Sequence, residues 1–425
     1  MISQSKIRGL ALAGAALTAA IPAAYALAPA PAAAQAAAYG PRWFGPGAGN
    51  ATQQLVQLLA TAQADGLNPK RYNVRGLSRA VQDAQSGNPG AVRRAEAMLN
   101  SALYAYARDL RHDPNVGIIY VDRELKPQPL SERELLAQAA AAPSLGDYVG
   151  KMGWMNPIYG QLRSAIAARM YRTDAERRLL MVNLERARAL PSGAGRYVIV
   201  NPPAARLYMY ENGQVVDSMR IVAGRPDPVA QTPMMNAFIR FVALNPYWNS
   251  PADLTRKLLA PRVVAGGRAY LDSKGYQLLS DWSDNAKVID PMSINWKAVA
   301  AGQIKARLRQ KPGPANSMGK MKFMFPNEQG IWLHDTPERE KIEDAARLQS
   351  NGCVRLEDAP RFLRWLFNGR APKPQGTRPE QKVNLPALMP IYITYLTAVP
   401  SGTSIVYFDD FYGKDRAASR RYASR

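Results

Sequence analysis

The chain contains a single cysteine, Cys353, and one of its only two histidines, His334, precedes it by 19 residues. A thiol with a pKa of about 8.5 is mostly protonated at neutral pH, and an adjacent imidazole can remove its proton to form the attacking thiolate. A lone cysteine is more often only a small buried apolar residue. The apolar stretch that ends in His334 and the glycine before Cys353 favour a nucleophilic acyl-transfer site instead.

The residues around the cysteine suit the same chemistry. Gly352 lacks a Cβ, so the backbone can turn sharply there and bring the amide N–H groups around Cys353 close to a bound carbonyl as an oxyanion site. Arg355 is a fixed cation that can bind a carboxylate with two hydrogen bonds. The alternative for Arg355 is a structural ion pair with Glu357 or Asp358.

These residues must be held by a sizeable fold. At 425 residues, with 47% hydrophobic and 21% charged residues, the chain has globular composition and exceeds what one hydrophobic core usually supports. Two or more folding units are therefore expected. The net charge of +22 predicts attraction to an anionic cell-envelope surface, and nucleic acid is not an expected partner outside the cytoplasm.

The first residues predict export. Lys6 and Arg8 precede an Ala/Leu-rich run over residues 9–28, the layout of a signal peptide, which we place at residues 1–38. An uncleaved N-terminal membrane anchor is the alternative. A periplasmic location follows, and a single cysteine cannot form an internal disulfide there.

Hydrophobic periodicity divides the rest into a helical and a mainly β part, which is an α+β fold. Residues 50–175 carry apolar side chains at spacings of three and four, typical of helices, and His112 is expected at a helix end or turn. Residues 190–400 predict strands at 197–200, 207–210, 215–222, 237–244, 330–334 and 391–396, with an Asn212-Gly213 hairpin turn. The Lys-, Arg- and Pro-rich residues 250–312 predict a lid or binding loop. Residues 401–425 predict a strand at 405–408 and a solvated basic tail.

The motif around the cysteine resembles a known signature. His334, fifteen further residues and then Ser350-Asn351-Gly352-Cys353-Val354-Arg355 is similar to the pattern of the YkuD-type L,D-transpeptidases. Further matches place the chain near the YcbB-like murein L,D-transpeptidases and cover most of residues 52–412. They are Asn245-Pro246-Tyr247-Trp248, Trp296, the stretch 310–316, the stretch 322–327 and His334-Asp335-Thr336-Pro337.

The resemblance implies roles for particular residues. Cys353 is the acylated nucleophile, His334 the general base, and the backbone carbonyl of Asp335 orients the imidazole. Gly352 and Cys353 supply oxyanion N–H groups. The residues expected to bind substrate are Trp332, Ser350, Asn351 and Arg355.

The resemblance also implies an architecture and a reaction. An N-terminal helical scaffold domain precedes the catalytic domain, and residues 250–312 form its lid. The enzyme acylates itself with a peptidoglycan stem peptide, releases D-alanine and cross-links the acyl group to another stem. It needs no metal or organic cofactor, and carbapenems are expected to acylate the cysteine.

Two departures from the family pattern stand out. Asn351 occupies a position where the family usually has a second histidine, so an altered rate or specificity is expected. A peptidoglycan-binding module that many YcbB-like proteins carry is not evident. Attachment to the wall is therefore left to the basic surface or to a wall-synthesis partner protein.

Other functions use the same residues. With water or a small amine as acceptor, the site would act as an L,D-carboxypeptidase, an L,D-endopeptidase or a D-amino-acid exchanger. A non-catalytic wall-binding scaffold is a further alternative, which Asn351 raises and the retained His334 and Cys353 oppose. A hydrolase of the NlpC/P60 type fits poorly, because its cysteine precedes its histidine in the chain.

Overall fold

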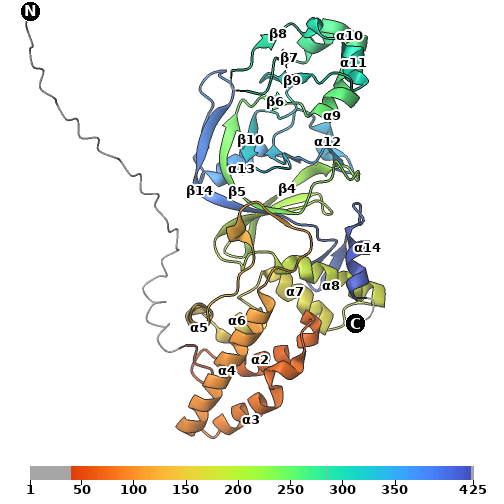
Figure 1. The fold of residues 1–425 in the computed structure, drawn as a ribbon. Helices are drawn as coiled ribbons and strands as arrows, with labels where there is room; N and C mark the ends of the chain where they lie inside the picture. Colours follow the sequence, from red (N-terminus) through yellow and green to blue (C-terminus); the bar gives the residue numbers. More distant parts are fainter. Residues whose placement is uncertain (1–39, 284, 423–425) are drawn as a thin grey trace, which may run out of the picture.

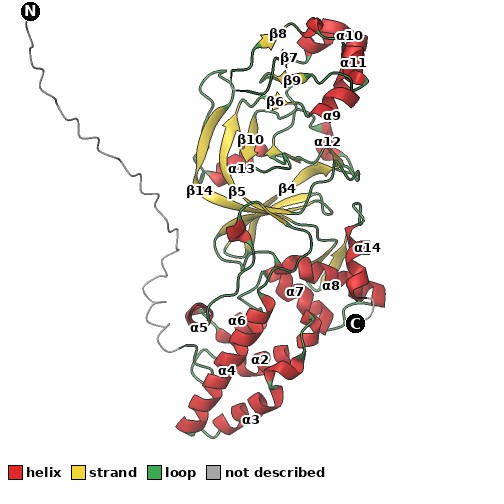
Figure 2. Ribbon diagram, in the orientation of Figure 1, coloured by secondary structure: helices red, strands yellow, loops and turns green. Residues whose placement is uncertain are grey.

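The computed structural model describes residues 40–283 and 285–422, and these form a helical part and a sheet-rich part. Figure 2 shows the helices of the first half of the chain gathered at one end of the molecule, and most strands with several further helices at the other. The expected signal peptide, residues 1–38, lies outside the described residues. Among the residues that are described, none of the helices combines the length and apolarity needed to cross a membrane.

The helical part has the amphipathic faces that the sequence periodicity predicts. In its longest helix, Leu99, Leu103 and Leu110 are fully buried on one face. That helix begins at Pro89, where the side chain of Asn88 accepts hydrogen bonds from the first free backbone N–H groups. The helices are α2 (Ala51–Ala60), α3 (Val74–Ala84), α4 (Pro89–Leu110), α5 (Glu132–Ala141), α6 (Leu145–Gly150), α7 (Pro157–Ala167) and α8 (Asp174–Arg188). His112 lies just after α4, with its Nδ1 3.0 Å from the carbonyl oxygen of Asp109.

A buried carboxylate ties these helices together. Asp65 accepts hydrogen bonds from the hydroxyls of Tyr106, at 2.7 Å, and Tyr159, at 2.9 Å. Arg163 forms an ion pair with it at 3.3 Å, and Arg188 of α8 donates to its backbone carbonyl at 3.2 Å. Because a buried charge is tolerated only when it is paired and hydrogen-bonded, this cluster fixes the packing of α8, which leads into the sheet.

The sheet-rich part is a set of strand pairings that closes on itself. The path runs β5, β10, β11, β13, β4, β3, β2 and β14, and β14 pairs with β5 again. Asn212 and Gly213 form the predicted turn, both with positive φ. The strands are β2 (Arg196–Asn201), β3 (Arg206–Glu211), β4 (Gln214–Gly224), β5 (Met235–Leu244), β10 (Met321–Met324), β11 (Leu333–His334), β13 (Val354–Leu356) and β14 (Gln381–Ile393).

Shorter elements complete this core. β1 (Ile119–Tyr120), from within the mainly helical region, pairs in parallel with β5, and β12 (Leu348–Ser350) pairs with β4. Helix α13 (Ala359–Leu366) covers the sheet, with the Phe362 ring edge-on to that of Phe323 at 4.8 Å between centroids. The small helix α12 (Glu340–Glu343) lies in the chain between β11 and β12.

The segment expected as a lid is a small unit with its own four-stranded sheet and core. In Figure 1 it lies at the end of the molecule away from the helical part. The Asn316 side chain donates to the carbonyls of Pro246 and Lys311, each at 2.9 Å, so it ties the two ends of the segment together. The elements are β6 (Trp248–Asn249), α9 (Ala252–Leu254), the π-helical η4 (Thr255–Leu259), α10 (Ala260–Ser273), β7 (Tyr276–Leu279), β8 (Val288–Ile289), α11 (Trp296–Ala300) and β9 (Arg307–Gln310).

In the C-terminal residues the strand expected at 405–408 is present, whereas the expected solvated tail is not. β15 (Ala398–Ser401) and β16 (Ser404–Tyr407) form a hairpin, and α14 (Lys414–Ser419) packs on α8. Asp415 of α14 is buried and pairs with Arg186 of α8 at 2.5 Å, while Tyr412 is also buried. The tail is basic, but it is not simply solvated, because the buried side chains of Asp415 and Tyr412 anchor it to the rest of the protein.

Candidate active site

His334 lies in a row of charged and polar side chains that crosses three strands. It pairs in register with Lys322 of β10 on one side and with Arg355 of β13 on the other. Directly paired residues share a face of a sheet, and the next residue along each strand points to the opposite face. Those next residues, Leu333 on β11 and its register partners Phe323 and Val354, are fully buried in the core. The row therefore occupies the face away from the core.

Cys353 lies diagonally opposite His334 on this same face. It precedes β13 and is two residues before Arg355, the register partner of His334. The pairing continues past the strand end, because the N–H of Val354 donates to the carbonyl of Trp332 at 2.9 Å. Diagonal neighbours in a sheet are roughly 7–8 Å apart at their Cα atoms, within reach of long side chains. The register thus places Cys353 on the face that carries His334, with its sulfur 3.5 Å from the carbonyl oxygen of Gly330.

A backbone carbonyl selects the tautomer of His334. The Nδ1 atom lies 2.5 Å from the carbonyl oxygen of Asp335, and a carbonyl can only accept, so Nδ1 carries the proton. The lone pair on Nε2 is then available to accept a proton. Asp335 is itself fixed, since its carboxylate accepts from the N–H of Lys320 at 2.8 Å and from Arg339 at 2.6 Å.

Burial keeps both reacting groups uncharged before reaction. It lowers the pKa of His334 to about 3, with the nearby charge of Arg355 contributing. Burial raises the pKa of the Cys353 thiol to about 11, against the opposing influence of the Trp332 N–H and of the Lys322 and Arg355 charges. The resting pair is thus a thiol and a neutral imidazole, and the proton must move as the sulfur attacks.

The turn before the cysteine depends on Gly352 and Ser350. Gly352 has a φ of +112°, and a Cβ there would lie 2.9 Å from the Ile331 side chain. The Ser350 hydroxyl donates to the carbonyl of Cys353 at 2.5 Å and accepts from the N–H of Gly352 at 3.1 Å. The Gly352 N–H, expected to bind an oxyanion, is therefore already engaged. Over residues 40–283 and 285–422 no acceptor is found for the N–H of Cys353, so this donor has the hydrogen-bonding capacity that an oxyanion site needs.

A brace that the sequence did not reveal holds this turn from behind. The Thr232 hydroxyl donates to the carbonyl of Gly352 at 2.8 Å and accepts from the N–H of Gly224 at 2.9 Å. The Tyr412 hydroxyl donates to the carbonyl of Gly224 at 2.6 Å. No motif signals Thr232 or Tyr412, because both act on the turn from distant parts of the chain.

The residues expected to bind substrate have different surroundings. Asn351 is exposed, and Trp332 is half-buried with its ring edge-on to Phe325 at 6.2 Å. Arg355 forms an ion pair with Glu338 rather than with Glu357 or Asp358, which pair with Arg220 and Arg361 respectively. Arg355 is thus in an ion pair, as the alternative interpretation expected, but its partner is Glu338 rather than Glu357 or Asp358. Glu338 follows β11, the strand that pairs with the strand of Arg355.

Lys322 is a further site residue that the sequence reading did not single out. Its ammonium lies 5.9 Å from the centre of the Trp332 ring and 3.9 Å from Glu380. The sequence did contain a signal for Lys322, because this residue belongs to the stretch 322–327, which carried part of the family resemblance. For the described residues, no cluster of three or more His, Cys, Asp or Glu side chains has metal-binding geometry.

Comparison with known proteins agrees with this geometry. Residues 195–379 match the L,D-transpeptidase catalytic domain, YkuD, and residues 35–166 match a scaffold domain. A Haemophilus influenzae protein named as a candidate L,D-transpeptidase is 28% identical over 279 residues, which cover 64% of this chain and 55% of that relative. The chain thus spans about half the length of the curated relative. It contains an L,D-transpeptidase catalytic domain of the YkuD type, which follows a scaffold domain.

Proposed function

We propose that this protein is a periplasmic peptidoglycan L,D-transpeptidase that cross-links stem peptides through a thioester on Cys353. The observation that carries the proposal is the tautomer of His334. Its Nδ1 proton is held by the Asp335 carbonyl, which leaves Nε2 as a base on the face that Cys353 shares. The match to the catalytic domain and the name of the Haemophilus influenzae relative support the same reaction class.

In the first half-reaction the sulfur forms a bond to a carbonyl carbon of the donor stem peptide. The Cys353 proton passes to Nε2 of His334, and the Cys353 N–H stabilises the oxyanion that develops. The bond from that carbon to the nitrogen of the terminal D-alanine then breaks. The leaving amine takes the proton from His334, and a thioester remains on Cys353.

In the second half-reaction an amine of another stem attacks the thioester. His334 removes a proton from this amine and returns it to the departing sulfur, which regenerates the thiol. The result is a new amide bond between two stems. Both steps use the chain's own groups only.

Two cations lie beside His334, and their positive charges can bind a substrate carboxylate and stabilise the thiolate of Cys353. Lys322 and Arg355 flank His334 in register, and the charges of both oppose the raised pKa of Cys353. Stem peptides carry free carboxylates, which suit such cations. Arg355 forms a close ion pair with Glu338, whereas the ammonium of Lys322 is 3.9 Å from its nearest carboxylate, that of Glu380, so we assign the principal carboxylate contact to Lys322.

The decisive assay incubates purified tetrapeptide muropeptides with the protein and identifies the products by mass spectrometry. We expect cross-linked dimers and free D-alanine from the wild type and neither from Cys353→Ala. Release of D-alanine without dimers would indicate a carboxypeptidase, and incorporation of an added D-amino acid would indicate an exchanger. If the wild type formed no product at all, the remaining candidate would be the non-catalytic wall-binding scaffold.

A further inference from the structure

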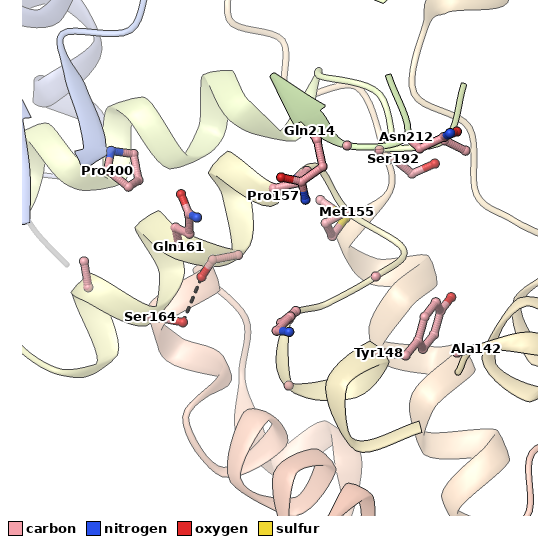
Figure 3. Close-up of a pocket in the computed structure, with 18 of the residues that line it drawn as sticks. Ala142, Tyr148, Met155, Pro157, Gln161, Ser164, Ser192, Asn212, Gln214 and Pro400 are labelled. Carbon is pink, nitrogen blue, oxygen red and sulfur yellow. Dashed lines mark hydrogen bonds between the residues drawn. The ribbon is translucent and has the colours of Figure 1, made fainter. Parts of the chain in front are cut away.

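A wide groove separates the helical part from the sheet-rich part, well removed in the fold from the row that contains His334. Its volume is about 1150 Å³. Helices α6 and α7, the turns at residues 192–194 and 212–214 and the β15–β16 hairpin all contribute to its lining (Figure 3). Ligand sites occur preferentially at such junctions between domains.

The groove is almost free of charge in a strongly basic protein. Of its 27 lining residues only Lys151 is a charged residue, whereas 21% of the whole chain is charged and the net charge is +22. Even Lys151 is paired, because its ammonium lies 3.0 Å from Asp147. A charged ligand would find no unpaired counter-charge in this groove. An uncharged polar ligand needs no counter-charge, so the lining suits it better.

The lining nevertheless offers many hydrogen-bonding groups. Figure 3 shows Gln161 and Ser164 on α7 opposite Asn212, Gln214 and Ser192 at the strand turns. The side chains of Gln161 and Gln214 are exposed, so their amides are open to a ligand. Ser164 and Asn212 are also exposed, but the Ser164 hydroxyl donates to the carbonyl of Gly160 at 2.9 Å, and Oδ1 of Asn212 accepts from the N–H of Gly195 at 3.2 Å. Apolar side chains between them, such as those of Met170 and Ile405, provide surface for methyl groups and sugar rings.

We propose that this groove binds the glycan strand of peptidoglycan, a polymer of N-acetylated sugars that is uncharged where its lactyl groups are amide-linked to stems. Amide and hydroxyl groups interspersed with apolar surface match the hydroxyls, acetamido groups and ring faces of such a polymer. Stem peptides carry carboxylates and suit the cations beside Cys353 instead. The proposal rests on the proposed function, and it gives a chain without an evident wall-binding module a way to hold its polymeric substrate.

The test is calorimetric titration of the full chain with a pentamer of β-1,4-linked N-acetylglucosamine. We expect saturable binding to the wild type and to Cys353→Ala. The double variant Gln161→Ala, Gln214→Ala should bind about tenfold more weakly, because two hydrogen-bonding side chains are lost from the groove. Gln82→Ala is the matched control, since Gln82 is an exposed glutamine on α3 outside the groove.

Three results would overturn the groove proposal. They are the absence of pentamer binding, equal binding by the double variant, and displacement of the pentamer by a sugar-free tetrapeptide. A second measurement separates this site from the catalytic one: the double variant should lose activity on intact sacculi more than on isolated muropeptides. Pentamer binding by a protein that forms no muropeptide product would contradict the proposed function and leave the groove assignment standing.

Discussion

The hydroxyl of Thr232 donates a hydrogen bond of 2.8 Å to the carbonyl of Gly352, although 120 residues separate the two in the chain. Gly352 is the residue before Cys353, so this bond fixes the turn that presents the thiol. Tyr412 extends the brace, because its hydroxyl holds the carbonyl of Gly224, whose N–H donates to Thr232. Displacement of a reacting group by about 1 Å can lower a rate by roughly 100-fold.

Loss of the brace should therefore reduce turnover more than substrate binding. For Thr232→Val we expect kcat on muropeptides to fall by about 10- to 100-fold with little change in KM. Thr232→Ser keeps the hydroxyl and should restore most of the rate, and Tyr412→Phe should show an intermediate loss. Tyr72→Phe is the control, because it removes a comparable hydrogen bond, to Asp109 at 2.9 Å, from the helical part. Equal kcat values for Thr232→Val and the wild type would refute the positioning role.

The position of Asp335 gives a second prediction. Gly319 has a φ of +63°, and a Cβ there would lie 2.4 Å from the carboxylate of Asp335. The backbone carbonyl of the same Asp335 orients His334. Gly319→Ala should lower kcat by about tenfold or more, because it displaces this support. Gly376→Ala has a similar φ of +61° with no neighbour within 4 Å, so it should share the backbone cost of about 1–2 kcal/mol but not the kinetic loss. Matching kcat values in both variants would argue against the coupling.

The pKa shifts predict an unusual pH dependence. With the pKa of Cys353 raised to about 11, alkylation by iodoacetamide should rise about tenfold per pH unit between pH 7 and 9. With the pKa of His334 lowered to about 3, the imidazole stays neutral, so acylation by a carbapenem should change little between pH 8 and 5. An ordinary histidine would lose about 30-fold at pH 5. An alkylation rate that levels off by pH 7 would show that a preformed thiolate is present instead.

Lys322 gives a test of substrate recognition. Lys322→Met should raise KM for stem peptides by about tenfold or more, because a charge-assisted hydrogen bond to the substrate carboxylate is lost. Lys126→Met is the control, since Lys126 also lies over an aromatic ring, at 5.8 Å from that of Tyr120, and pairs with a carboxylate at 3.1 Å. Steady-state kinetics on tetrapeptide muropeptides distinguishes the two. An unchanged KM in Lys322→Met would move the carboxylate contact elsewhere.

Local patterns in the sequence predicted much of this fold. The helical spacing of Leu99, Leu103 and Leu110, the apolar runs of β2 to β5, and the Asn212-Gly213 turn all have short-range causes. The strand β14 was predicted only from residue 391, because its first half contains Pro386 and exposed residues and is held by pairing with β5. Pairing over such distances in the chain leaves little local signal.

The candidate site divides in the same way. The spacing of His334 and Cys353 and the glycine between them are local features, and they led us to predict a nucleophile and its base. The register then places both residues on one face of the sheet. The sequence led us to expect an oxyanion role for the Gly352 N–H, but it could not show that this N–H donates to the Ser350 hydroxyl. The brace through Thr232 and Tyr412, and the pairing of Arg355 with Glu338, arise only when distant segments pack together.

The central claim is that His334 activates Cys353, and the rate of carbapenem acylation followed by intact-mass spectrometry tests it most directly. The account predicts one adduct on the wild type, located on Cys353, and none on Cys353→Ala. In His334→Gln, acylation should be slower by about 1000-fold or more, as for other enzymes that lose the base of a nucleophile pair. An adduct on another residue, or an unchanged rate in His334→Gln, would contradict the account.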